Sequence, residues 1–172
     1  VYKLMKELKV ISWRVINVDP IGRAKNNNDI LLYKDDYKYL FNFIKEKREE
    51  NLMNVEYGCS HYLGIDLEKE IRDTYFLCTA GLYVASILSN GDIFICPDVE
   101  RRKEFIQGNI KTDNFVDVWE NRFKIFRTEN RTKCSKCEKC SNWKYCLGDS
   151  FHTFNFDEGR PNFCIKDVYG DE

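Results

Sequence analysis

Five of the eight cysteines lie between residues 134 and 164. Cys134, Cys137 and Cys140 follow one another at two-residue gaps. This spacing can direct several thiolates at one centre, as a metal ion or an iron–sulfur cluster requires. Secreted disulfide proteins, the alternative class, are usually shorter and poorer in apolar residues than this chain. The spacing therefore favours a metal or cluster site in a reducing, cytoplasmic compartment.

The cysteines and one glycine form a longer ordered pattern. It runs Cys78-x12-Gly91-x4-Cys96, then Cys137-x2-Cys140-x5-Cys146, and finally Cys164. This order closely resembles the SPASM domain, the C-terminal extension of many radical S-adenosylmethionine (radical SAM) enzymes, which include anaerobic sulfatase-maturing enzymes and peptide maturases. Six of the family's seven cysteine positions are met. Further similar segments extend the resemblance over about residues 76–166: Ser89-Asn90-Gly91-Asp92-Ile93, Gly108-Asn109-Ile110, Asp117-Val118-Trp119 and Cys146-Leu147-Gly148.

In that family the domain holds one or two auxiliary [4Fe–4S] clusters, and thiolates suit such soft centres. The resemblance implies two sets of ligands. The second auxiliary cluster would be held by Cys137, Cys140, Cys146 and Cys164. The first would be held by Cys78 and Cys96, and we expect Cys59 to join them.

The chain departs from the family pattern at the first cluster. The family's fourth central cysteine, normally a ligand of that cluster, is Ser150 here, and Cys134 is additional. Candidates for a further ligand are Cys134, Asp149, Ser150 and His152. Alternatively, the site stays open for substrate, as catalytic metal sites often do, or holds no cluster.

The radical SAM signature, Cys-x3-Cys-x2-Cys, does not occur in the 172 residues. Without it this chain cannot generate the radical by itself, so we expect it to be the rear portion of a longer enzyme. The segment Asp19–Ala24 (DPIGRA) resembles the last part of the radical SAM barrel. Asn17, Asp19 and Arg23 follow a predicted strand, at the end where barrel enzymes place their active sites. These three residues therefore either line a cofactor pocket or belong to an ordinary turn, which the Asp-Pro pair and Gly22 would also favour.

Residues 1–72 carry alternating helix and strand patterns. Apolar spacing predicts a helix over Val1–Lys9 and a buried strand over Ile11–Val18. A second helix, capped by Asp36, should run from Tyr37 to about Glu50 and face Tyr37, Leu40, Phe41 and Ile44 inward. A strand over Val55–Cys59 follows. This order fits a parallel sheet, and we interpret residues 1–72 as the tail of a TIM-like α/β barrel.

Residues 73–172 are expected to form the small cluster-binding domain. Apolar runs at Leu82–Leu88 and Ile93–Cys96 flank an Asn-Gly pair, which predicts a β-hairpin. A helix over Phe115–Arg127, capped by Thr112 or Asp113, should follow. The Cys- and Lys-rich loop after Glu129 has few apolar residues, so a bound metal would have to order it. The predicted fold class is therefore α+β, with a barrel tail, a hairpin, a helix and Cys-rich loops.

Composition narrows the classes of partner. The net charge is −1 and the isoelectric point is near 6.2, which gives no whole-chain reason to expect binding to nucleic acid. No apolar run approaches the roughly 20 residues of a membrane span. The oligomeric state has no signal in the sequence.

Two functional hypotheses follow. In the first, the chain is the auxiliary-cluster part of a radical SAM oxidoreductase or maturase that modifies a peptide or protein, with S-adenosylmethionine as the full-length enzyme's cofactor. In the second, zinc replaces the clusters and the chain is a four-cysteine scaffold that binds a partner without a redox role.

Overall fold

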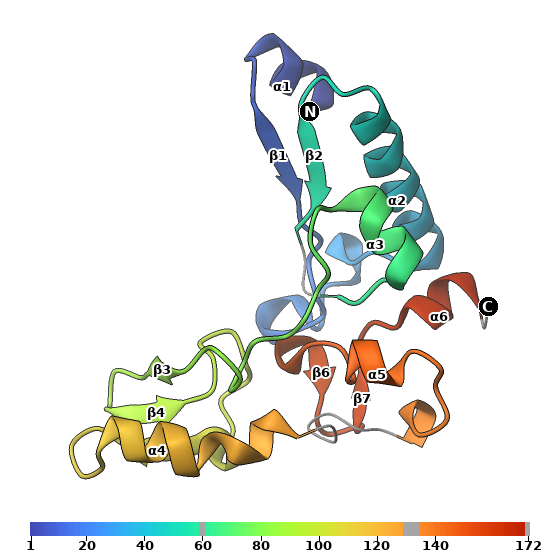
Figure 1. Ribbon diagram of the computed structural model, residues 1–172. Helices are drawn as coiled ribbons and strands as arrows, with labels where there is room; N and C mark the ends of the chain where they lie inside the picture. Colours follow the sequence, from blue (N-terminus) through green and yellow to red (C-terminus); the bar gives the residue numbers. More distant parts are fainter. Residues whose placement is uncertain (59–60, 129–134, 171–172) are drawn as a thin grey trace. The chain divides into compact units, whose positions relative to one another are not determined.

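A computed structural model describes residues 1–58, 61–128 and 135–170 (Figure 1). The chain divides into two compact units. The first unit comprises Val1–Phe76 and Asn162–Glu172, and the second comprises Leu77–Pro161. Mixed helices and strands confirm the α+β class. The functional division at residue 72/73 stays a prediction.

The first unit is built on a parallel strand pair, β1 (Ser12–Val15) and β2 (Asn54–Tyr57). Between them the chain forms α2 (Lys34–Glu49), which lies beside the pair in Figure 1. The predicted strand–helix–strand order is therefore confirmed, but the expectation of a buried first strand is wrong, because no residue of β1 is buried. The unit also contains α1 (Tyr2–Glu7), α3 (Ile65–Ile71) and α6 (Ile165–Tyr169), of which only α1 was expected.

The core of the first unit forms on the inward face of α2. Phe41 and Ile44 are fully buried and Tyr37 is nearly so, as the apolar spacing predicts, while Leu40 is partly buried. The predicted cap, Asp36, is wrong, because the helix begins at Lys34. Asp36 instead lies in the first turn, where its carboxylate accepts the N–H of Tyr33 at 2.9 Å. This arrangement satisfies one of the donors that a helix start leaves without an intrahelical partner.

The second unit begins with an antiparallel sheet of β3 (Ser86–Ile87), β4 (Asp92–Phe94) and β5 (Ile106–Asn109), in that order. The predicted hairpin is confirmed, and β5 adds a third strand. Gly91 in the turn has φ +97°, which favours glycine. A Cβ at Gly91 would also lie 2.8 Å from Asn109 Oδ1, so the Asn109 side chain would have to move to accommodate it.

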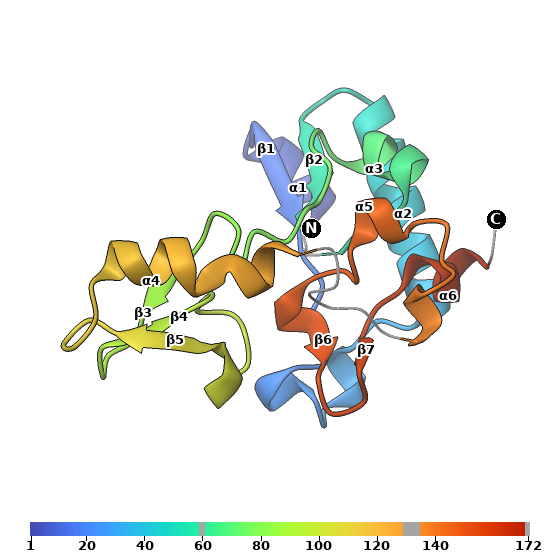
Figure 2. The same ribbon diagram turned by 60° about the horizontal axis from the view of Figure 1, so that its bottom comes forward.

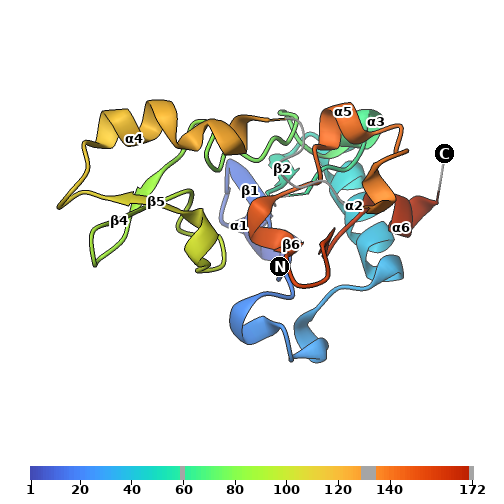
Figure 3. The ribbon, with the colours of Figure 1, turned by 90° about the horizontal axis from the view of Figure 1, so that it is seen from below.

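The helix α4 (Phe115–Asn121) runs beside this sheet in Figures 2 and 3. It continues into a 3-10 helix, Phe123–Arg127, whose Phe123 and Phe126 are buried as predicted. Phe115 was expected to face the core but is 40% exposed. Short elements complete the unit: α5 (Trp143–Cys146), β6 (Phe154–Asn155) and β7 (Arg160–Pro161). Within the described ranges, no helix has the length and apolar character needed to cross a membrane.

The start of α4 is capped by Asn114, not by Thr112 or Asp113. Its Oδ1 accepts the N–H groups of Val116 at 2.9 Å and Asp117 at 3.2 Å. We therefore expect Asn114→Ala to lower the free energy of unfolding by about 1 kcal/mol, since it leaves both donors without this partner. Urea unfolding measures the loss, and Asn121→Ala, at the other end of the helix, is the matched control. Equal stability of the two variants would contradict the assigned cap.

Candidate cluster-binding site

Cys78 lies in the second unit and is only 7% exposed. Its sulfur accepts the backbone N–H of Phe151 at 3.5 Å. The hydroxyl of Ser150 donates to the same sulfur at 3.9 Å. Two donors from consecutive residues therefore converge on one buried sulfur.

Cys96, the other residue that the resemblance assigns to the first cluster, is half-buried in the same unit. Burial raises the pKa of the Cys96 thiol. The backbone N–H of Asp98 lowers this pKa by hydrogen-bonding the sulfur, whereas the negative charges of Asp98 and Cys78 raise it further. Both residues that the family resemblance assigns to the first cluster therefore lie in the second unit.

Three of the four candidates for a further ligand lie in the described part of this region. Ser150 is fully buried, and its Oγ lies 2.5 Å from His152 Nδ1. Asp149 is 3% exposed and accepts a hydrogen bond from Thr153 Oγ1 at 3.4 Å. Of the three, Ser150 contacts Cys78 directly and His152 contacts Ser150. The fourth candidate, Cys134, and the expected ligand Cys59 lie outside the described residues.

A sharp backbone reversal separates Cys146 from Ser150. Leu147, Gly148 and Asp149 have φ values of +51°, +83° and +69°. A bulky residue such as leucine rarely adopts this left-handed conformation, which costs of order 1–3 kcal/mol. Ser150 and Phe151, which follow it, supply the two donors to Cys78.

Cys137, Cys140 and Cys146 lie on a run of short turns. The N–H of Cys140 donates to the carbonyl of Cys137 at 3.2 Å, and the N–H of Cys146 donates to Asn142 at 2.9 Å. All three are half-buried. Cys164, the fourth member of this expected set, is half-buried at the start of α6, in the first unit.

No disulfide joins any two of the six described cysteines. Within residues 1–58, 61–128 and 135–170, no three His, Cys, Asp or Glu side chains already form a group that could hold a metal ion. The assigned ligand sets therefore remain predictions. The fit of a thiolate-bound group is supported by the two donors to the buried Cys78 sulfur.

Two of the three predicted pocket residues of the first unit, Asn17 and Asp19, belong to a largely buried polar network. Asn17 Nδ2 donates to Asp19 Oδ1 at 2.8 Å, and His61 Nε2 lies 2.8 Å from the same oxygen. His61 is fully buried and stacks on Phe163, with ring centroids 4.3 Å apart. Arg23 makes none of these contacts and is exposed on the 3-10 turn Gly22–Ala24.

Two tyrosines that sequence reasoning assigned only to packing or strand formation complete the network. Tyr57 donates its hydroxyl to Asn17 Oδ1 at 2.5 Å, and Asn17 donates to the Tyr37 hydroxyl at 3.2 Å. The parallel register explains their place in the network. Val15 pairs with Tyr57, so Asn17 lies beside the end of β2. The network therefore lies at the carboxyl ends of both strands, where α/β proteins place their sites.

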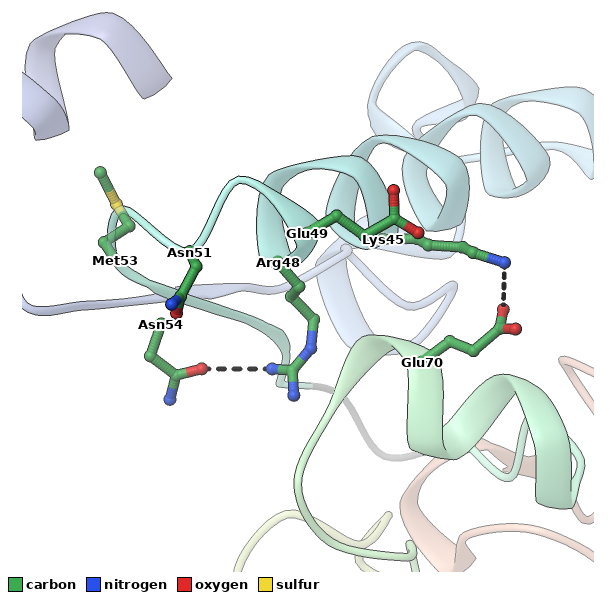
Figure 4. Close-up of a pocket in the computed structure, with 7 residues that line it drawn as sticks. All are labelled: Lys45, Arg48, Glu49, Asn51, Met53, Asn54 and Glu70. Carbon is green, nitrogen blue, oxygen red and sulfur yellow. Dashed lines mark hydrogen bonds and ion pairs between the residues drawn. The ribbon is translucent and has the colours of Figure 1, made fainter.

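A surface hollow lies at the opposite ends of these strands (Figure 4). Three of its charged side chains are already paired: Lys45 with Glu70 at 3.0 Å, and Arg48 with Asn54 at 3.1 Å. In α/β barrels this end serves stability more than catalysis. The hollow therefore does not compete with the cysteine region as a functional site.

Residues 78–141 match a family model described as SPASM, an iron–sulfur cluster-binding domain. The resemblance to the SPASM family is confirmed. The matched SPASM segment contains Cys78, Gly91, Cys96, Cys137 and Cys140. The assignments of Cys146, Ser150 and Cys164 rest on spacing beyond the matched SPASM segment.

Known proteins resemble a wider part of the chain. A curated relative from Oleidesulfovibrio alaskensis, named AdoMet-dependent heme synthase, is 23% identical over 156 residues, which cover 80% of this chain and 39% of the relative. A solved structure described as native anSMEcpe with bound AdoMet and Cp18Cys peptide matches with a TM-score of 0.59 at 22% identity, covering 98% of this chain and 49% of that one. A second structure, with Kp18Cys peptide, gives 0.52 at 22% identity, covering 87% and 42%. The chain thus spans less than half the length of these proteins, and the structural likeness shows a shared fold.

Proposed function

We propose that this chain is the auxiliary iron–sulfur portion of a radical SAM enzyme that modifies a peptide or protein. The observation that carries the proposal is the buried sulfur of Cys78, at the start of the segment that matches the SPASM model, which accepts two hydrogen bonds. The spacing of the remaining cysteines supports a second centre. A peptide substrate is supported by the two similar solved structures, which hold bound Cp18Cys and Kp18Cys peptides.

The ligand assignment is part of the proposal. The second auxiliary [4Fe–4S] cluster is held by Cys137, Cys140, Cys146 and Cys164, and four thiolates complete such a site. The first is held by Cys78 and Cys96 together with Cys59, with Cys134 as a further candidate. When bound, these clusters supply a route for an electron leaving a substrate radical, or a surface for binding the substrate.

Residues of this chain donate hydrogen bonds to the sulfurs of the first site. The donors from Ser150 and Phe151 stabilise negative charge on Cys78, and the N–H of Asp98 does the same for Cys96. Burial of Cys78 excludes water from its sulfur. Both effects bear on the reduction potential of an iron–sulfur centre, which depends on hydrogen bonds to sulfur and on solvent exposure.

Anaerobic reconstitution with iron and sulfide tests the proposal. We expect a brown chain with stoichiometric iron and acid-labile sulfide and an electron paramagnetic resonance (EPR) signal after reduction. A colourless chain with zinc and no sulfide would contradict the proposal and support the four-cysteine scaffold instead. A matched control, reconstituted after alkylation of all thiols in denaturant, should bind neither iron nor zinc.

A further inference from the structure

We propose that Ser150 and His152 form a hydrogen-bonding pair that raises the reduction potential of the first auxiliary cluster by donating to the Cys78 sulfur, and that Ser150 is not itself a ligand. This inference rests on the proposed function, since it requires a cluster at Cys78. It assigns a role to the serine that stands where the SPASM family has a cysteine.

The geometry of three consecutive residues carries the inference. Ser150 is fully buried, and its hydroxyl donates to Cys78 Sγ at 3.9 Å. The next residue, Phe151, donates its backbone N–H to the same sulfur at 3.5 Å. Hydrogen bonds to a ligating sulfur stabilise the more negative, reduced state of a cluster and so raise its potential.

His152 determines where the Ser150 hydroxyl points. A hydroxyl carries a single hydrogen, so Ser150 can donate to Cys78 only when it accepts from His152. His152 Nδ1 lies 2.5 Å from Ser150 Oγ. A neutral imidazole with its hydrogen on Nδ1 donates to Oγ and leaves the hydroxyl hydrogen for the sulfur. His152 is therefore a positioning residue that acts through Ser150.

Ligation by Ser150 is less favourable in this setting. Coordination would require a buried alkoxide beside the thiolates of Cys78 and Cys96, and an isolated buried charge is costly. The contacts of Oγ with His152 and Cys78 already use the hydroxyl as acceptor and donor. Both contacts suit a neutral hydroxyl.

Ser150→Ala tests the inference in the reconstituted chain. We expect unchanged iron and sulfide and a more negative potential for the first cluster in an EPR-monitored redox titration. That cluster's signal is identified by its loss in Cys96→Ala. After exchange into deuterium oxide, electron–nuclear double resonance should detect a deuteron coupled to the reduced cluster that is absent from Ser150→Ala.

Thr153→Val is the matched control. Thr153 is fully buried in the same turn, and its hydroxyl donates to Asp149 and to the Ser150 carbonyl, both at 3.4 Å. Removing this hydroxyl should affect stability but leave the potential unchanged.

His152 is only partly buried, so it can be substituted with less disturbance of the packing. His152→Ala should shift the potential in the same direction as Ser150→Ala. His152→Asn, which keeps an amide near the Nδ1 position, should restore part of the shift.

Three results overturn the inference. Loss of iron in Ser150→Ala would make Ser150 a ligand. If the reduction potential is unchanged in both Ser150→Ala and His152→Ala, the pair does not influence the cluster. A shift in Thr153→Val as large as that in Ser150→Ala would assign the effect to packing. Failure of the proposed function is seen separately, as an unsubstituted chain that binds no iron and sulfide.

Discussion

Cys137→Ala is expected to remove the iron and sulfide of one [4Fe–4S] cluster from the reconstituted chain. The reason is that Cys137 is one of four proposed thiolate ligands, and an all-cysteine cluster site needs all four to close. The cluster at Cys78 and Cys96 should remain. Iron and sulfide analysis measures the loss, and EPR of the reduced protein shows which signal disappears.

The same variant should loosen the segment around Cys137. The turns at Ser135–Cys137 and Trp143–Cys146 contain no buried residue, so few apolar contacts hold them. Structural metal sites contribute on the order of 10 kcal/mol to such segments. We therefore expect limited proteolysis to cut residues 135–146 much faster in Cys137→Ala than in the reconstituted parent chain.

Two further variants make this result interpretable. Ser141→Ala, which alters an exposed neighbour of Cys140, should retain all the iron. Cys96→Ala should lose the other EPR signal, and the double variant with Cys137→Ala should lose both. Full iron content in Cys137→Ala would contradict the ligand assignment, and loss of one common signal in both single variants would contradict two separate sites.

Local features of the fold were predictable because their causes are local. The Asn-Gly pair at residues 90–91 fixes the hairpin turn through the positive φ of Gly91. The spacing of Tyr37, Phe41 and Ile44 fixes the inward face of α2. In both cases neighbouring residues decide the structure, so the sequence contains enough information.

The partner of Cys78 was not predictable from such patterns. Ser150 lies 72 residues further along the chain, and its contact depends on the strained reversal at Leu147–Asp149. Sequence reasoning proposed Asp149, Ser150 and His152 as candidates but had no basis for ranking them. Only the tertiary structure places the Ser150 hydroxyl at the sulfur and His152 behind it.

Glu68 was not singled out by sequence reasoning, although it is the centre of a buried network in the first unit. The residue is 1% exposed, and its carboxylate accepts the N–H groups of Leu63 at 3.0 Å and Phe76 at 3.1 Å. The guanidinium of Arg72, also buried, pairs with both of its oxygens and donates to the His61 carbonyl at 2.5 Å. One carboxylate thus fixes three separate points of the chain.

Glu68→Gln is therefore expected to lower the free energy of unfolding by about 3–5 kcal/mol, because it leaves the Arg72 charge buried without a counter-charge. Urea unfolding measures the loss. Hydrogen exchange should also show faster exchange at the amides of Leu63 and Phe76, which lose a charged acceptor.

Glu70→Gln, on the same helix α3, is the matched control, because Glu70 is exposed and its pairing with Lys45 is a surface ion pair. It should leave the stability of the chain unchanged. Adding Arg72→Met to Glu68→Gln should recover part of the lost stability, since the unpaired charge is then gone and an apolar side chain replaces it. If Glu68→Gln is as stable as Glu70→Gln, the buried carboxylate does not hold the segment around His61.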